Sequence, residues 1–165
     1  MSKKELLVYL QLFIRPTIVA LLVAIVWYFI FRRFGFSIPE ADESAFTDAG
    51  IPVIAMFHAI VAGGVLVKVW EEHKAVLRCI KKEDRNAFLD CVQSRIPMVI
   101  HLLLGSMSII IIFLTMMIHF EGALGGIAMN SSVAFVLALY WEVATNLDDP
   151  VKGVWYVGKI PKDWL

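Results

Sequence analysis

The chain has 165 residues, of which 59% are hydrophobic and 18% are charged, and its mean hydropathy is +0.75. Soluble domains are nearer to half apolar and a quarter charged, so this composition indicates a chain that places much of its surface in lipid. The formal net charge is zero, which excludes the global basic field typical of nucleic-acid-binding proteins. We expect an all-α, polytopic membrane protein that forms one domain over residues 1–165.

Four segments are long and apolar enough to cross a bilayer core of about 30 Å, for which a helix needs roughly 20 residues. They cover residues 6–31, 51–72, 96–120 and 123–147. A short helical loop, residues 73–95, joins the second segment to the third, and residues 148–165 form a tail. Only a turn with Glu121 and Gly122 separates the last two segments, which predicts an antiparallel helical hairpin.

The first segment is interrupted by Arg15 and Pro16. We expect residues 3–14 to form an interfacial turn, and Pro16 to be either a first-turn proline or the site of a kink. A cleavable signal peptide is the alternative, but the apolar run ends in Phe-Arg-Arg-Phe at residues 31–34, without a small-x-small cleavage site. In each of the next two segments, a proline near the start suits a first helical turn.

The placement of lysine and arginine predicts the orientation. One side of the membrane would carry only Arg32 and Arg33, whereas the other side would carry eleven basic residues. These are Lys3, Lys4, Lys74, Arg78, Lys81, Lys82, Arg85, Arg95, Lys152, Lys159 and Lys162. We therefore expect both termini on the cytoplasmic side of a bacterial inner membrane. Cys79 and Cys91 lie in the same basic loop, where a reducing cytoplasm disfavours a disulfide.

The basic loop is expected to be helical. Residues 71–82 contain no Gly or Pro, so the second helix can continue past the membrane surface. Asp84 follows a predicted turn and is a candidate N-cap for a short helix that ends at Arg95. One apolar stripe on that helix should pack against a neighbouring helix, a second subunit or lipid headgroups. The stripe consists of Ala87, Phe88, Cys91 and Val92.

The second segment has two distinct faces when its residues are placed 100° apart. One face has an apolar middle and a charged cytoplasmic end, which would suit the wall of a water-filled pore. It consists of Ile54, His58, Val61, Val65, Lys68 and Glu72. The other face is small and indicates close helix packing. It consists of Ala55, Ala59, Ala62, Gly63 and Leu66. Two alternatives stay open: Lys68 and Glu72 can pair at the interface, and His58 can be a buried, hydrogen-bonded histidine.

In the third segment, small and polar residues recur at alternating spacings of four and three. They are His101, Gly105, Ser108, Ile112, Thr115 and His119. This seam predicts a helix–helix interface in lipid. In the fourth segment, Glu142 lies near the cytoplasmic end, where it would be a snorkelling acid or a partner for Arg15 or Lys68.

The sequence contains no recognisable catalytic or metal site. His58 and His119 are expected toward the outer side and His73 and His101 toward the cytoplasmic side, with no compact ligand spacing among them. A bis-histidine haem would need two imidazoles at one depth on facing helices. No nucleophilic triad, Gly-rich phosphate loop or paired-carboxylate centre stands out. We expect no metal, no cofactor and no enzymatic activity.

Two segments together resemble a known family. Residues 57–73 (Phe-His-Ala-Ile-Val-Ala-Gly-Gly-Val-Leu-Val-Lys-Val-Trp-Glu-Glu-His) resemble the second helix of the bacterial bestrophin-like membrane proteins, where an apolar, Gly-containing helix ends in a Trp-polar-polar-aromatic exit. Residues 146–153 (Asn-Leu-Asp-Asp-Pro-Val-Lys-Gly) resemble the Leu-Asp-x-Pro-Phe-x-Gly stretch after the fourth helix of that family. Val151 departs from the usual Phe, and the cytoplasmic loop is much shorter than in the family.

The resemblance implies a ring of subunits, pentameric in bestrophins, whose second helices line a central anion-conducting pore. It carries over to this chain only the second-helix stripe and the residues Asp148, Asp149 and Pro150. The calcium clasp of bestrophins cannot be located, so calcium gating is not implied. The implied partners are the lipid bilayer, further copies of the chain and inorganic anions.

Two classes of function therefore remain. The first is a small homo-oligomeric ion channel or pore, indicated by the polar second-helix stripe and the resemblance. The second is a non-conducting accessory or assembly subunit of a larger membrane complex, favoured by the small size and by small-residue faces that need partners.

Overall fold

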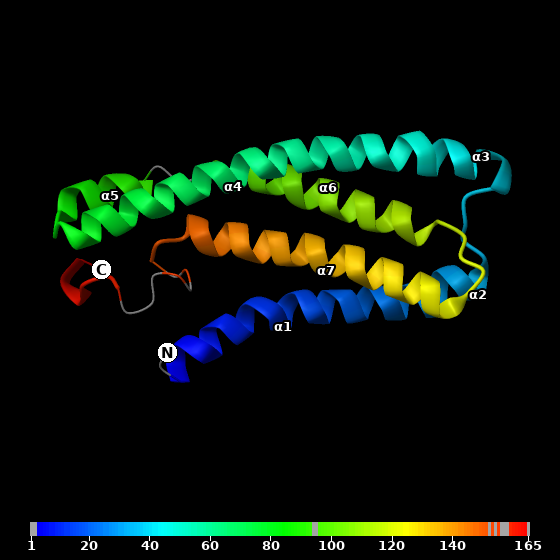
Figure 1. The fold of residues 1–165 in the computed structure, drawn as a ribbon, viewed down its shortest axis with the longest axis horizontal. Helices are drawn as coiled ribbons and strands as arrows, with labels where there is room; N and C mark the ends of the chain where they lie inside the picture. The colour runs from blue at the N-terminus through cyan, green and yellow to red at the C-terminus, as the bar shows by residue number, and fades with distance from the viewer. Residues whose placement is uncertain (1–2, 94–95, 152, 154, 156–158, 165) are drawn as a thin grey trace.

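The computed structural model describes residues 3–93, 96–151, 153, 155 and 159–164, and every regular element within them is a helix (Figure 1). The four long helices are α1 (Lys3–Val26), α4 (Ile51–Lys81), α6 (Met98–Met116) and α7 (Ala123–Asp148). The shorter elements are π-helical turns at Trp27–Phe31 and Phe46–Gly50, the helices α2 (Arg32–Phe34), α3 (Glu40–Ala45) and α5 (Arg85–Gln93), and a 3₁₀ turn at Lys162–Trp164.

Within the described residues, four helical stretches are long and apolar enough to cross a membrane. They are Leu10–Phe34, Asp42–Lys81, Met98–Met116 and Ala123–Asp148. The all-helical fold class and the four candidate spans are therefore confirmed. The second stretch has 40 residues, because helical turns precede Ile51 and α4 continues well past Glu72.

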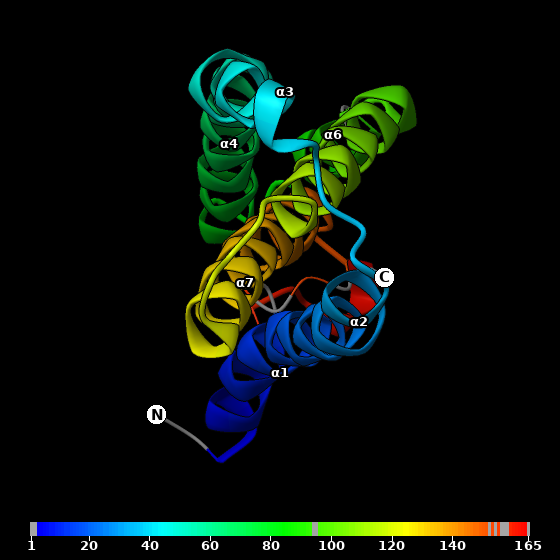
Figure 2. The same ribbon diagram turned by 90° about the vertical axis from the view of Figure 1, so that its right-hand side faces the viewer.

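Helix α7 lies at the centre of the bundle. Seen end-on, α1 flanks α7 on one side, and α4 and α6 flank it on the other (Figure 2). Helices α4, α6 and α7 contact one another, and α1 packs along α7. A short loop makes α6 and α7 an antiparallel hairpin, as predicted. The core between α4, α6 and α7 is formed by Ala62, Val65, Val69, Ile96, Leu104 and Leu147.

Helix α1 is continuous through Pro16, which is fully buried. The alternative of a first-turn proline is therefore wrong, and so is the expected interfacial turn over residues 3–14, because the helix begins at Lys3 and Pro16 lies in its interior. A proline in this position removes the N–H that would bond the carbonyl of Leu12 and favours a kink. The ribbon of α1 slopes in its N-terminal part and then runs alongside α7 (Figure 1).

The helix that contains the second span begins earlier than the sequence predicts. A π-helical turn, Phe46–Gly50, joins α3 directly to α4, and the N–H of Ile51 donates to the carbonyl of Phe46. Pro52 is the second residue of α4 and cannot donate to a preceding carbonyl. The wider π turn accommodates this missing donor without ending the helix.

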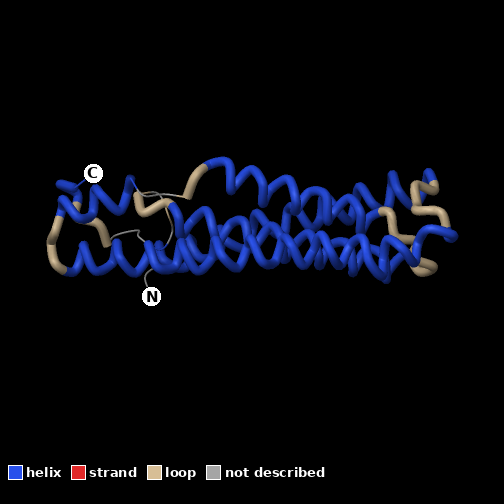
Figure 3. Tube along the Cα trace, turned by 90° about the horizontal axis from the view of Figure 1, so that it is seen from above, coloured by secondary structure: helices blue, strands red, loops and turns tan. Residues whose placement is uncertain are grey.

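The start of α1, the α4–α5 turn and the C-terminal 3₁₀ turn lie at the same end of the bundle (Figure 1, Figure 3). At this end α4 continues to Lys81, and the backbone N–H of Ala87 donates to the Asp84 carboxylate at 3.0 Å, which confirms the predicted N-cap. The apolar stripe of α5 packs within the chain: Phe88 is buried against Val76 and Trp164. The predicted helix end at Arg95 lies outside the described residues.

Candidate functional site

The stripe of α4 predicted to line a pore faces the interior of the single chain over much of its length. His58 and Val65 are buried, and Val61 is half-buried against the core of α4, α6 and α7. Ile54, near the N-terminal end of α4, is half-buried. The apolar middle of this stripe is therefore covered by neighbouring helices of the same chain.

His58 is the centre of a polar contact between three helices. Its Nε2 lies 3.0 Å from the Oγ of Ser108, and that hydroxyl lies 2.9 Å from the carbonyl of Leu104, four residues earlier in α6. Since the hydroxyl donates its proton to the carbonyl, it accepts from His58, which places a proton on Nε2. The ring of Tyr140 meets the His58 ring edge-on, and the Tyr140 hydroxyl donates to the carbonyl of Ala62. In the single chain, His58 is a buried and hydrogen-bonded histidine.

The face of α4 predicted to pack against another helix is divided. Ala62 is buried in the core and Ala55 is half-buried, but Ala59 and Gly63 are exposed. A Cβ built on Gly63 or on the neighbouring Gly64 would meet no atom within 4 Å. The glycines therefore leave a shallow, unfilled notch on the outward face of α4.

The outward face of α4 continues on both sides of this notch. Val53, Ile60 and Val67 are exposed and apolar, and Glu71 and Lys74 are exposed toward the cytoplasmic extension of the helix. We call this set, with Gly63 and Gly64, the outward face of α4. It combines an apolar stretch, a glycine notch and a charged end along one helix.

Charged groups of α4 and α7 gather where α6 begins. Lys68 and Glu72 form an ion pair with an N–O distance of 3.6 Å, as the interfacial alternative expects. Asp148 accepts the backbone N–H of Ile96 at 3.2 Å and lies 3.8 Å from Nε2 of His101. Asp148 therefore holds the segment before α6 against the end of α7.

The rest of the predicted motif after the fourth helix shapes the chain locally. Asp149 accepts the backbone N–H of Val151 through its carboxylate, and its carbonyl accepts the N–H of Gly153 at 2.7 Å. Pro150 is buried between them. These contacts form a tight turn at the end of α7.

Most of the predicted seam of the third segment lies against neighbouring helices, but His119 follows the end of α6 and is exposed. Gly105 faces Trp141, whose ring would be 3.4 Å from a Cβ at this position, and the rings of His101 and Trp141 meet edge-on. Ser108 contacts α4 through His58, and Thr115 is buried with its hydroxyl bonded to its own helix. The small residues of the seam therefore allow α7 and α4 to approach α6 closely.

Glu142 of α7 pairs with Arg15 of α1, which is one of the two partners predicted for it. The Arg15 Nη1 lies 3.0 Å from Oε1 of Glu142, and the Nδ2 of Asn146 donates to the same oxygen at 3.2 Å. Two cavities share this pair: one of about 430 Å³ between α1, α6 and α7, and one of about 360 Å³ toward the end of α7. The walls of these cavities come from helices that are distant in the sequence, α1, α6 and α7 for the larger and α1 and the end of α7 for the smaller, so local patterns could not predict them.

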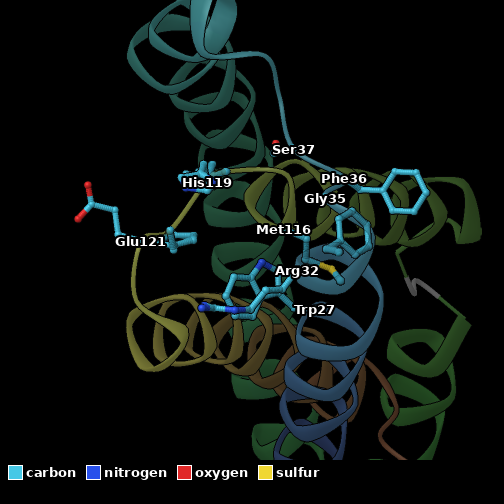
Figure 4. A pocket seen from close by; sticks show the side chains of 11 residues that line it. Trp27, Arg32, Gly35, Phe36, Ser37, Met116, His119 and Glu121 are labelled. Atoms are coloured by element: carbon cyan, nitrogen blue, oxygen red, sulfur yellow. The ribbon is translucent and has the colours of Figure 1, made fainter.

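A third cavity, of about 330 Å³, lies at the opposite end of the bundle (Figure 4). The Arg32 guanidinium lies 6.0 Å from the ring centroid of Trp27, whereas the Glu121 carboxylate points away from the other labelled side chains. His119 is exposed at the rim. Among the described residues, no group of three or more His, Cys, Asp or Glu is placed to hold a metal ion.

Comparisons with protein-family models, with characterised proteins and with solved structures give no match to this chain. The resemblance to bestrophin-like proteins stays a prediction from residues 57–73 and 146–153.

Proposed function

We propose that this chain is the repeating subunit of a homo-oligomeric membrane channel, a closed ring in which α4 lies nearest the shared axis. The observation that carries the proposal is the outward face of α4, with its exposed glycine notch and charged end. The ring is pentameric by the resemblance to bestrophins. Both termini and α5 lie on the cytoplasmic side of a bacterial inner membrane.

The exposed faces of the long helices differ in side-chain size. Helix α1 and α6 present large side chains such as Phe13, Leu21 and Phe113, which suit contact with acyl chains. On α4, the exposed Ala59 and Gly63 allow another backbone to approach closely. Because helices in lipid associate through small residues, this part of α4 is suited to meet a second copy.

The outward face of α4 also has the features of a conduction path. Exposed Ile60 and Val67 would form apolar rings that gate by dewetting, and the charged end would form a mouth. Lys68 is paired with Glu72, and the two other exposed cations, Lys74 and Arg78, outnumber the exposed Glu71 on this part of α4. A surplus of fixed positive charge at a mouth raises the local concentration of anions, so the proposed path conducts anions.

Planar-bilayer recording of the purified protein tests the proposal. Val67→Ala should raise the conductance by widening the apolar ring, and Lys74→Glu should shift the reversal potential in a salt gradient toward cations. Val65→Ala is the matched control, because Val65 is buried among α4, α6 and α7 and should leave conductance unchanged. Silence from all these proteins would contradict the channel and favour a non-conducting assembly subunit.

The ring is tested separately by native mass measurement in several mild detergents. A closed homo-oligomer is expected, and Gly63→Leu should reduce its stability because the side chain fills the notch. Gly125→Leu on α7 is the control, since a Cβ there also meets no atom within 4 Å. A monomer in every detergent would contradict the ring.

The orientation is tested by cysteine accessibility in intact cells, in a chain with Cys79 and Cys91 changed to serine. Ser44→Cys should react with an impermeant maleimide from outside, and Asn86→Cys should react only after permeabilisation. Both residues are exposed, and the helices that contain them, α3 and α5, lie at opposite ends of the bundle (Figure 1). Labelling of Asn86→Cys from outside would reverse the proposed topology.

A further inference from the structure

The two cavities that share Arg15 and Glu142 lie next to each other along α1 and α7, and the larger one also borders α6. We call the two cavities together the groove. No residue of α4 lines either cavity, so the groove is separate from the outward face of α4. Helix α6 lines it from Gly105 to Ile112, which covers about 10 Å along the helix axis at 1.5 Å per residue. A ligand in this groove would therefore not depend on the proposed channel.

The two parts of the groove differ in chemistry. Beyond Arg15 and Glu142, the larger cavity is lined mainly by apolar groups, among them Val19, Ile109 and Leu137. The smaller cavity is lined mainly by polar side chains. They are Gln11, Arg15, Glu142, Thr145, Asn146 and Asp149. The charged pair lies at the boundary, so the groove is polar at one end and apolar at the other.

The charges of the polar part alternate in sign over a short distance. Three quarters of the Arg15 side chain is exposed, although it donates to Glu142, and a guanidinium has five N–H donors. Its remaining donors can therefore reach an anionic group in the groove. Glu142 and Asp149 add two carboxylates to the same cavity. The cavity thus offers a cationic donor beside an excess of acceptors.

We propose that this groove binds a zwitterionic phospholipid whose headgroup carries a primary ammonium. The phosphate takes the Arg15 guanidinium, the ammonium lies against the carboxylates of Glu142 and Asp149, and one acyl chain fills the apolar cavity toward Ile112. Guanidinium groups bind phosphates through parallel N–H bonds, and an ammonium provides three donors for carboxylates.

The charges distinguish this headgroup from other lipids. An anionic headgroup without an ammonium would bring a negative charge beside two carboxylates and would donate no charged hydrogen bond to them. A choline headgroup has a positive charge but no N–H, so it cannot donate to Glu142 or Asp149. The groove should therefore prefer phosphatidylethanolamine to phosphatidylglycerol and to phosphatidylcholine of the same acyl chains.

Native mass spectrometry of the delipidated protein with these three lipids tests the preference. We expect the wild type to retain phosphatidylethanolamine at least about tenfold more strongly than the other two, the ratio that one charge-assisted hydrogen bond supplies. Equal retention of all three lipids would overturn the proposal, as would a preference for phosphatidylglycerol.

Two variants act on different parts of the groove. Arg15→Gln should weaken retention of all three lipids, because each of them carries the phosphate that Arg15 binds, with Arg33→Gln, an exposed arginine of α2, as its control. Ala138→Phe should reduce retention of every lipid by filling the apolar cavity while leaving the charges in place. Its control is Ala128→Phe, at an exposed position of α7 outside the groove. Unchanged retention in both Arg15→Gln and Ala138→Phe would place the bound lipid elsewhere.

Discussion

The indole of Trp27 lies in a notch that Gly126 makes in α7. A Cβ built on Gly126 would overlap the indole ring, and Trp27 itself is 3% exposed. Phe120 closes the notch with an edge-on contact at a centroid distance of 6.0 Å. Because Gly126 has no side chain, the indole of Trp27 can pack directly on the backbone at the start of α7. This contact fixes the end of the first span against α7.

Gly126→Ala should destabilise the bundle. The buried, rigid indole would have to move, and overpacking of this kind typically costs about 1–3 kcal/mol. Gly125→Ala is the matched control, because a Cβ there meets no atom within 4 Å and the change gains helix propensity. Thermal unfolding in detergent, followed by circular dichroism, compares the two. Equal melting temperatures would show that Trp27 does not occupy this notch.

The hydrogen bond between His58 and Ser108 predicts a difference between two serines of α6. Ser108→Ala leaves the buried Nε2–H of His58 without its acceptor, which should cost about 1–3 kcal/mol. Ser106 also bonds the carbonyl four residues earlier, but it is exposed, so Ser106→Ala should change stability by less than about 0.5 kcal/mol. Denaturation of both variants in the same detergent measures the difference. Equal losses would contradict the assigned contact.

Hydropathy and local chemistry predict much of the fold. Long apolar runs predict the four spans, and the Asp84 carboxylate predicts the start of α5, because each signal lies within one continuous stretch of the sequence. The sequence left open whether Pro16 starts or kinks the first helix, and packing against α7 holds the helix continuous there. The π turn before Pro52 was also missed, because a proline near a helix start is equally typical of a first turn.

Periodicity cannot predict which face of α4 points into the bundle and which points outward. Spacing shows that His58 and Val65 share a face of α4 and that Gly63 lies on another. In lipid, apolar residues gain nothing by turning inward, so hydropathy does not say which face meets α6 and α7. The structure turns His58 inward and Gly63 outward. The lipid groove likewise depends on three helices that are distant in sequence.

The Arg15–Glu142 pair predicts strong non-additivity. Arg15→Met alone should destabilise the bundle, because Glu142 is largely buried and would retain only the Asn146 amide. Breaking a buried pair from one side leaves an uncompensated charge, whereas removing both charges is often nearly neutral. Adding Glu142→Gln should therefore recover most of the lost stability. A double-mutant cycle of unfolding free energies measures the coupling, and simple additivity would show that the two groups act independently.

The packing of the C-terminal turn onto α5 predicts the reactivity of Cys91. Burial raises the pKa of the Cys91 thiol, with a further contribution from the adjacent Cys79, so less thiolate is present at a given pH. Trp164 belongs to the apolar cluster against which both cysteines pack. Trp164→Ala should let water reach the thiol and lower its pKa toward the ordinary value. The pH profile of alkylation should then move to lower pH, and the rate below about pH 9 should rise.

Iodoacetamide labelling with peptide-resolved mass spectrometry follows Cys91 and Cys79 separately in the folded protein. Val151→Ala is the matched control, because Val151 is exposed in the same C-terminal region and lies outside the cluster. It should leave the alkylation profile of Cys91 unchanged. If Trp164→Ala also leaves that profile unchanged, the C-terminal turn does not cover α5 in solution, and the burial of Phe88 must come from α4 alone.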